Sequence, residues 1–581
     1  MNVDLLKNRT LRAFLISGLY PGVFQAITAG VFVVVIFQLI TGPSSTHDNF
    51  GMALTWVLWW PIIPIIFVVL GRFWCAICPF GTLSDLVQKI AGKKRAVPAF
   101  LKKYGIWIID FLFILITWAD HIWGIVDNPI GSAVLLLAIT AGVIISGAFF
   151  MRRTWCRYLC FLGGLAGNYS RSGMVALRAN EEVCVTCKAR AACYNGNEKG
   201  PGCPMFEFPR QLDSNAQCNF CADCLKTCPN DAIQITVRPP TQELWFIRKP
   251  KFEEAFLAII IMGIVLVQNI TMLEVWGSML QTLQQITGTT DVVINFTITF
   301  LIAMAIPLAL FALAAFIARR FNGDSFSSNF GKFGYAIIPL DIAGHMAHNL
   351  FHLLAEGKSV VFTAQTLVGH AVSTESAALL PTPTIQVLQY ALLAVGALGS
   401  VYAVYAIAKN HYVQSKRWGA VTSYSILIVV FLSINGWLFA MPMSMRMHQT
   451  HSHGIPEGHE DPSQWYDDPN ADSWPRKLNM DSIFPPSEGR ELTMTVCTSC
   501  HSFIRIVYGH HSHSHSTGVP GEDTHWDPHR VRHEPRFKAL TKEQIDTIYV
   551  SCPRTSYTKK SRDIVHIVAE SSHPHIGLTI A

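Results

Sequence analysis

The cysteines near residue 220 are the residues of this chain whose type and spacing point most directly to chemistry. Cys218, Cys221, Cys224 and Cys228 are separated by two, two and three residues, and Pro229 follows the last of them. Four thiolates at this spacing before a proline are typical ligands of a 4Fe–4S cluster. The run therefore predicts a centre that carries electrons.

A second group of cysteines lies just upstream and ends in Cys203 and a proline. In ferredoxins with two clusters, the Cys–Pro thiolate of each run ligates the cluster of the other run. The sequence therefore predicts two ligand sets, which are Cys184, Cys187, Cys193 and Cys228 for one cluster and Cys218, Cys221, Cys224 and Cys203 for the other. Zinc or disulfides fit less well, because zinc ribbons use paired C-x2-C motifs without a dense third cysteine and a closing Cys–Pro.

Two further pairs of cysteines occur in an internal repeat. The repeated motif is Arg-x-Trp-Cys followed by a second cysteine, and it gives the pairs Cys75/Cys78 and Cys156/Cys160. Each motif follows an apolar hairpin, so four thiols could converge where duplicated halves meet. They would hold a further cluster or another metal, act as a dithiol pair, or simply pack as small buried side chains. The arginine of each motif favours chemistry, since thiolates beside basic groups are the reactive or ligating kind.

A haem-attachment motif lies near the C-terminus. Cys497, Cys500 and His501 form the C-x-x-C-H signature of covalent haem c, with a disulfide or zinc as the alternative. No methionine follows His501, so the sixth iron ligand is expected to be a histidine. The candidates are His510, His511, His513, His515, His525, His529 and His533. Cys552 has no role that the sequence suggests.

The composition indicates a membrane protein, because half of the 581 residues are apolar and only 14% are charged. Nine apolar stretches are long enough to cross about 30 Å of hydrocarbon. They are 20–41, 52–71, 105–125, 131–150, 254–273, 293–317, 333–356, 385–408 and 420–442. The predicted fold class is mainly α, a polytopic membrane helix bundle with a cytoplasmic two-cluster ferredoxin-like insert and a small periplasmic all-α cytochrome c domain.

Five regions follow from these patterns. Residues 1–172 form the duplicated two-span hairpins with their cysteine pairs, and 173–250 form the cluster segment. Residues 251–442 add five spans, 443–486 form a polar linker, and 487–581 form the cytochrome c domain.

Basic residues predict the orientation of the spans. They gather before the first span and after the second, fourth, sixth and eighth, whereas the opposite loops carry one, Lys358. The positive-inside rule then places the N-terminus and the cluster segment in the cytoplasm and everything after Met441 in the periplasm, in a bacterial inner membrane. Haem c is attached outside the cytoplasm, which agrees with this orientation. The net charge of +6 is explained by the loop bias and gives no reason to expect nucleic acid.

The seventh predicted span carries a polar face. Its ionisable residues recur at steps of four, three, four and four, so they lie on one side of a helix. They are Asp341, His345, His348, His352 and Glu356, and His121 and His370 are expected nearby at the outer surface. Ionisable side chains inside a membrane are costly and usually functional. A haem b with two histidine ligands and a quinone site with proton uptake are the two hypotheses.

The hairpin pairs and the cluster cysteines together resemble the membrane polyferredoxins of the NapH/NosR/CcoG type. The resemblance covers about residues 10–275 and rests on Cys75/Cys78, Cys156/Cys160 and the two cluster sets. It implies a protein that serves a periplasmic reductase or the assembly of an oxidase. The first pair is one residue tighter than the usual C-x3-C-P of that family, and Phe161 replaces the proline after the second pair.

The sequence as a whole predicts an electron-transfer subunit of a respiratory complex. Electrons would move between the cytoplasmic clusters, a membrane haem b or quinone site and a periplasmic haem c. Other redox subunits, a cytoplasmic electron donor and a periplasmic cytochrome or reductase are the expected partners, and the activity is that of a quinone oxidoreductase subunit or a carrier without its own substrate. The alternative is an assembly factor that reduces a metal centre, with His448, His451, His453 and His459 handling metal.

Overall fold

A computed structural model describes residues 3–369 and 376–441, together with the short strands β6 (Trp465–Tyr466) and β7 (Leu478–Asn479). The chain divides into two compact units, Met1–Met443 and Ser444–Ala581. In the second unit, β6 and β7 pair in antiparallel fashion within the predicted linker. The predicted haem c site, its histidine candidates, the metal-handling histidines, His370 and Cys552 lie outside the described residues.

Seven helical stretches of the described chain are long and apolar enough to cross a membrane, which makes this a polytopic helical membrane protein. They are Gly22–Thr41, Phe50–Ala91, Pro129–Phe149, Phe252–Thr271, Val292–Asn322, Thr382–His411 and Gln414–Ala440.

The structure differs from the nine predicted spans in two places. Helices α7 (Ala99–Trp123) and α18 (Ile338–Glu356) form where spans were expected, but neither is among the seven. The reason is polarity, because α7 carries two lysines near its start and two buried or half-buried aspartates, and α18 carries the histidine face. The second predicted span is present as a helical run from Phe50 to Leu70, which ends before the cysteine pair.

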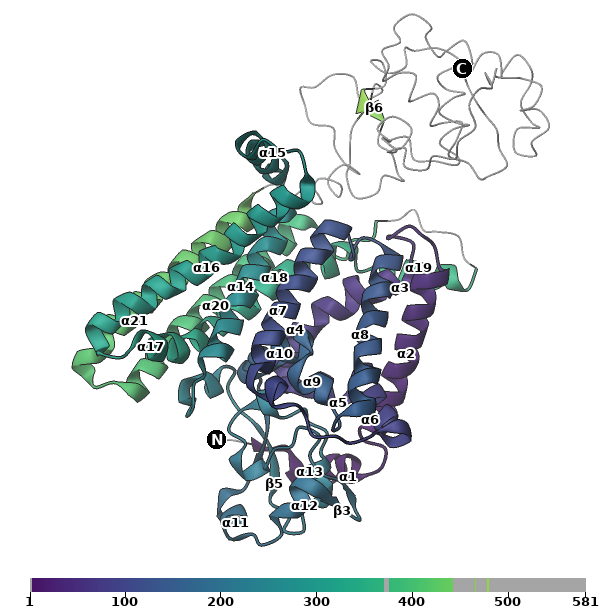
Figure 1. Ribbon diagram of the computed structural model, residues 1–581, viewed down its shortest axis with the longest axis vertical. Coiled ribbons are helices and arrows are strands. Elements are labelled where there is room, and N and C mark those ends of the chain that lie inside the picture. The colour runs from purple at the N-terminus through teal and green to yellow at the C-terminus, as the bar shows by residue number, and fades with distance from the viewer. Residues whose placement is uncertain (1–2, 370–375, 442–464, 467–477, 480–581) are drawn as a thin grey trace, which may run out of the picture. The chain divides into compact units, whose positions relative to one another are not determined.

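The two hairpin repeats have the same local structure. In the first, α4 (Trp60–Leu70) leads through η3 (Gly71–Phe73) into the short helix α5 (Trp74–Ile77) and then α6 (Pro79–Ala91). In the second, α8 (Pro129–Phe149) leads into α9 (Thr154–Tyr158) and α10 (Phe161–Tyr169). Helices α2 (Gly22–Thr41), α6 and α8 pack together, and Figure 1 shows α5, α6 and α9 at the same end of the bundle.

The cysteine-rich segment is enclosed by a small antiparallel sheet at that end of the bundle (Figure 1). Strands β2 (Val175–Ala179) and β5 (Ile233–Val237) pair over five residues, from Val175 with Val237 to Ala179 with Ile233. The N-terminal strand β1 (Val3–Asp4) adds to the other edge of β5. Between β2 and β5 lie three short helices and a hairpin, which are α11 (Glu181–Thr186), α12 (Arg190–Asn195), α13 (Asp223–Thr227), β3 (Gly196–Asn197) and β4 (Gly200–Pro201).

The remaining helices pack around α14 (Phe252–Thr271), whose residues from Ala255 to Val267 are nearly all buried. A helix that is apolar on every side belongs in the interior of a bundle. Its neighbours include α16 (Val292–Asn322), α17 (Phe326–Phe333) and α18, and α18 packs in turn against α20 (Thr382–His411), which pairs with α21 (Gln414–Ala440). The other helices are α1 (Arg9–Ile16), α3 (Phe50–Met52), α15 (Val275–Thr287) and α19 (Ser359–Leu367). Helix α18 is thus held inside the protein.

Candidate functional site

The four hairpin cysteines come together, and each repeat positions its pair in the same way. The first cysteine of each pair lies in a short helix, and the second, Cys78 or Cys160, is the N-cap residue of the helix that follows. Cys160 Sγ accepts a hydrogen bond from the Gly163 amide at 3.2 Å. Burial raises the pKa of Cys156 to about 11, and the charge of Cys75 adds to the effect. Burial likewise raises the pKa of Cys160, with further contributions from the other three thiols.

Two buried arginines line this four-cysteine site. Arg72 Nε donates to Cys75 Sγ at 3.3 Å, and Arg153 Nη1 donates to the Cys75 carbonyl at 2.7 Å. Arg153 is only 2% exposed and forms an ion pair with Asp85 at 2.8 Å. Positive charge beside a thiol favours its thiolate form, which is the form that ligates iron.

A glycine in each repeat makes room for the arginine of the other repeat. Gly81 lies three residues after Cys78, and a Cβ atom there would meet Arg153 Nη1 at 2.7 Å. Gly163 lies three residues after Cys160, and a Cβ atom there would meet the Cys156 carbonyl at 2.8 Å and Arg72 Nη2 at 3.2 Å. The two halves of the site are therefore interlocked.

These residues fit a 4Fe–4S cluster, because such clusters are held by four cysteine thiolates and tuned by hydrogen bonds to sulfur. The site offers four thiols, an amide donor at Cys160 and a guanidinium donor at Cys75. Among the described residues, no group of three or more His, Cys, Asp or Glu side chains is arranged to hold a single metal ion.

The cysteine-rich segment brings its thiols into two groups. Cys184 and Cys193 both interact electrostatically with Cys228, the Cys–Pro thiol of the downstream run. In the same way, Cys218 and Cys221 interact with Cys203, the Cys–Pro thiol of the upstream run. The structure thus places each Cys–Pro thiol beside the other run.

The thiols of this segment are buried to different degrees. Burial raises the pKa of Cys218 to about 11 and places that of Cys224 well above its usual value. Backbone amides also point at sulfur, since Phe220 N donates to Cys218 Sγ and Ala232 N to Cys228 Sγ, both at 3.4 Å. The Asn230 side chain donates to Cys187 Sγ at 3.1 Å. Metal ligation would hold such buried thiols in the deprotonated form.

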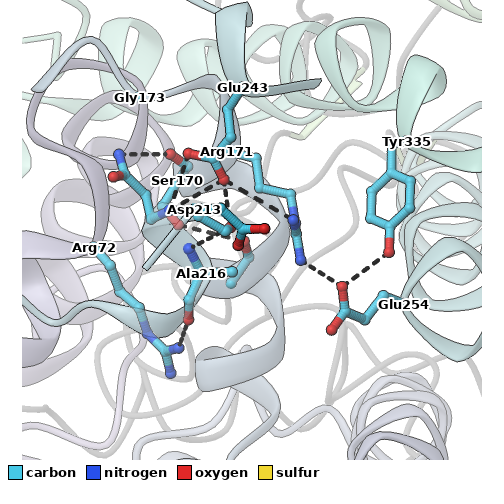
Figure 2. A network of polar contacts seen from close by, with 12 residues as sticks. Arg72, Ser170, Arg171, Gly173, Asp213, Ala216, Glu243, Glu254 and Tyr335 are labelled. Atoms are coloured by element: carbon cyan, nitrogen blue, oxygen red, sulfur yellow. Dashed lines mark hydrogen bonds and ion pairs between the residues drawn. The ribbon is translucent and has the colours of Figure 1, made fainter. Parts of the chain in front are cut away.

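Glu243 is the buried acceptor that fixes the loop before Cys218 (Figure 2). Its carboxylate accepts from the Asn215 amide at 2.9 Å and from the Ser214 hydroxyl. It also forms ion pairs with Arg238 at 2.6 Å and Arg178 at 3.1 Å. A carboxylate with this many donors is satisfied in spite of its burial, so the loop is held in one position.

Arg72 connects the four-cysteine site to this loop. Besides its bond to Cys75 Sγ, its Nη1 donates to the carbonyl of Ala216, two residues before Cys218 (Figure 2). Nearby, Arg171 pairs with Glu254 at the start of α14, and Glu254 accepts from the Tyr335 hydroxyl at 2.9 Å. The two cysteine sites are therefore joined by one buried polar network.

A row of aromatic rings leads from the four-cysteine site into the bundle. Trp74, next to Cys75, lies with its ring centroid 5.5 Å from that of Trp59. Trp59 lies 5.9 Å from Trp60, and Trp60 lies 5.7 Å from the His345 ring. Trp59 ends a π-helical segment, Ala53–Trp59, a geometry that is frequent at functional sites. The rings join Cys75 to the polar face of α18.

The polar face of α18 lies in the interior, and the structure locates one of its two predicted partners, His121, whereas His370 lies outside the described residues. His348 shares a hydrogen bond with Asn269 at 2.9 Å, and its ring centroid is 5.3 Å from that of His352. His121 lies near this face, where its Nδ1 bonds the Thr117 carbonyl at 2.8 Å and its Nε2 bonds Thr271 Oγ1 at 3.2 Å.

Several residues of the site had not been identified from the sequence. Glu243, Glu254 and Tyr169 stand in no motif, and Tyr169 shares a hydrogen bond with His345 at 3.1 Å. Gly81 and Gly163 could have been found, because a glycine at the same offset in both copies of a repeat is a signal of close packing.

Comparison with known proteins agrees with the cysteine chemistry. Residues 52–98 and 133–175 match a family described as a 4Fe-4S binding domain, and each matched segment contains one hairpin pair. No solved structure matched the chain.

Among curated proteins, this chain is similar to three relatives from different organisms. An uncharacterized protein of Methanocaldococcus jannaschii is 26% identical over 194 residues, which are 30% of this chain and 76% of the relative. The putative electron transport protein YccM of Escherichia coli is 26% identical over 28% of this chain and 51% of its own length. The regulatory protein NosR of Pseudomonas aeruginosa is 24% identical over 27% of this chain and 23% of its own length. This chain thus spans about half of YccM and under a quarter of NosR.

The fold and the site define a polytopic membrane protein of the iron–sulfur electron-transfer class. Its N-terminal part is similar to membrane polyferredoxins of the NapH/NosR type.

Proposed function

We propose that the protein is an electron-transfer subunit of a membrane redox complex. Electrons pass between two 4Fe–4S clusters in the cysteine-rich segment, a third cluster at Cys75, Cys78, Cys156 and Cys160, and a site on α18. The haem c predicted at Cys497, Cys500 and His501 is the redox centre on the periplasmic side. In the predicted orientation, a cytoplasmic donor and a periplasmic cytochrome or reductase are the partners.

The observation that carries this proposal is the position of Arg72. One guanidinium bonds both Cys75 Sγ and the loop two residues before Cys218. The same group is therefore part of the surroundings of both cysteine sites, which favours transfer between them. The 4Fe-4S binding family match over both hairpins supports iron–sulfur chemistry at the inner site.

For the site on α18, the geometry favours quinone over haem b. Two axial nitrogen ligands of one metal each lie about 2 Å from it, whereas His345 and His352 are seven residues apart, about 10.5 Å along one helix. His121 has hydrogen bonds at both ring nitrogens, so neither is free for iron. In contrast, the Asp341 carboxyl oxygens and His345 Nε2 have no hydrogen-bond partner in the described structure, and they suit the oxygens of a quinone or quinol.

The test is to remove one cluster at a time from the purified, full-length protein. We expect Cys224→Ala and Cys78→Ala each to lose one cluster's iron and sulfide and a different signal in a potentiometric EPR titration. Each variant is the matched control for the other. A haem stain should survive denaturation and vanish in Cys500→Ser. Unchanged iron and EPR spectra in Cys78→Ala would contradict a cluster in the membrane hairpins.

A further inference from the structure

The polar face of α18 is a continuous row of titratable side chains. Asp341, His345, His348, His352 and Glu356 follow one another at intervals of three or four residues, so they are stacked along one side of the helix. At 1.5 Å per residue, the row extends about 22 Å along the helix axis. That length is a large part of the roughly 30 Å hydrocarbon core of a bilayer.

The inner end of the row has unsatisfied polar atoms. Asp341 is 0% exposed and His345 is 3% exposed. Neither carboxyl oxygen of Asp341 nor His345 Nε2 has a hydrogen-bond partner among the described residues, whereas His345 Nδ1 is bonded to Tyr169. Buried polar groups are almost always satisfied by protein or ordered water. An isolated carboxylate in an apolar interior is so costly that the group takes up a proton.

The middle of the row is buried and its rings lie close together. His348 is 8% exposed and is oriented by Asn269 of α14, which bonds its Nδ1 at 2.9 Å. Its ring centroid is 5.3 Å from that of His352. Neutral imidazole carries a donor on one nitrogen and an acceptor on the other, so it can receive a proton on one side and release a proton from the other.

The Glu356 end of the row is partly exposed. His352 and Glu356 form a pair at 3.6 Å, and their side chains are 23% and 22% exposed. Asp127, in the loop between α7 and α8, interacts electrostatically with both of them and also with His121 and His47. Acidic groups therefore surround the histidine through which a proton would enter.

We propose that this row conducts protons between water at the Glu356 end and the Asp341–His345 pair. Each step moves one proton between neighbouring heteroatoms, directly or through an ordered water. In the complete process one proton leaves the water at Glu356 and one is gained by the inner pair, with no electron moved by these residues. The inference goes beyond electron transfer, and it holds whichever molecule is reduced in the membrane. A proton delivered there compensates negative charge that arrives along the rings of Trp74, Trp59 and Trp60.

Infrared spectroscopy of the full-length protein in lipid nanodiscs, without added quinone, tests the proposal. The C=O band of a protonated Asp341 should be present in the native protein and absent in Asp341→Asn. After transfer to heavy water, the band shifts as the Asp341 proton exchanges for deuterium. This exchange should be about tenfold or more slower in His348→Gln than in the native protein, which corresponds to about 1.4 kcal/mol on the barrier to proton transfer. Glu356→Gln should slow the shift in the same direction.

His411→Gln, at the exposed end of α20, is the matched control and should leave the rate unchanged. Retention of the native iron–sulfur absorption spectrum establishes that each variant is folded. An exchange rate in His348→Gln equal to the native rate overturns the proposal. If no acid band is lost in Asp341→Asn, the proposal is overturned as well, because the inner acceptor would then be another group.

Discussion

The surroundings of the cysteines and the polar face of α18 differ in whether their buried charged groups have partners. Beside the cysteines, buried charges are paired, as Arg153 is with Asp85 and as Glu243 is with Arg178 and Arg238. On α18, the buried carboxyl of Asp341 has no hydrogen-bond partner among the described residues. Paired charges hold a geometry constant, and an unpaired titratable group can change its protonation state. The comparison therefore separates a region built to position cofactors from a region suited to exchange protons.

The strongest way to break this comparison is to remove the acceptor that pairs three arginines. Glu243→Ala leaves Arg171, Arg178 and Arg238 without their shared carboxylate, and breaking a buried pair typically costs about 3–5 kcal/mol. We expect a lower thermal unfolding midpoint and loss of the cluster held by Cys218, measured by calorimetry and iron content. The exposed Glu274→Gln is the control and should have no effect on either. A stable Glu243→Ala variant with all of its iron would show that this network does not position the cysteine loop.

A smaller effect is expected from packing at the hairpin site. In Gly163→Ala the new Cβ meets the Cys156 carbonyl at 2.8 Å, so backbone or side chains must move. Overpacking of this kind costs about 1–3 kcal/mol, and we expect the EPR signal of the hairpin cluster to broaden or disappear. Gly30→Ala in α2 is the matched control, since nothing lies within 4 Å of its Cβ position. Equal stability and spectra in both variants would refute the tight packing of the two repeats.

The smallest effect is expected from a charge pair nearer the surface. Its loss gives a reference value with which the cost of breaking a buried pair can be compared. Asp324 accepts from Lys332 and Tyr412, both at 2.6 Å. Burial alone would raise the pKa of Asp324, but its hydrogen bonds to Lys332 and Tyr412 lower the pKa below its usual value.

The pKa of Asp324 is lower in the folded than in the unfolded state. The stability that its ionised carboxylate contributes is therefore present above about pH 3.9 and is lost as the pH falls through the folded pKa. Asp324→Asn should therefore lower the free energy of unfolding by about 0.2–1 kcal/mol at neutral pH. In acid, the variant should lose less stability than the native protein does. Thermal midpoints measured as a function of pH check this. Glu198→Gln, exposed and without an ion pair in the described structure, should follow the native curve. A cost in Asp324→Asn as large as that in Glu243→Ala would remove the distinction between surface and buried pairing.

Local spacing predicted the parts of the site that depend on a single element. The period of Asp341, His345 and His348 placed them on one face of a helix, and the structure has α18 there with all three buried. The predicted spans at α7 and α18 form as helices, although their polar and charged side chains keep both outside the seven apolar stretches.

Contacts between distant segments could not be predicted. Glu243 bonds residues 28 and 29 positions earlier, and nothing in its own surroundings indicates burial. The strand β1 is two residues long, too short for any alternation to be recognised, yet it completes the sheet beside the cysteine-rich segment. Such features depend on the closed fold rather than on local sequence.

In each hairpin, a glycine makes room for the arginine of the other hairpin, and this arrangement has a consequence for the symmetry of the site. Each repeat alone has two thiols and a pocket for an arginine that only the other repeat supplies. Two identical hairpins related by a two-fold axis would complete each other in the same way, since such an interface uses the same surface on both copies. The site therefore resembles the interface of a two-fold dimer contained in a single chain. The two copies are not identical, because one has Cys-x2-Cys-Pro and the other Cys-x3-Cys-Phe.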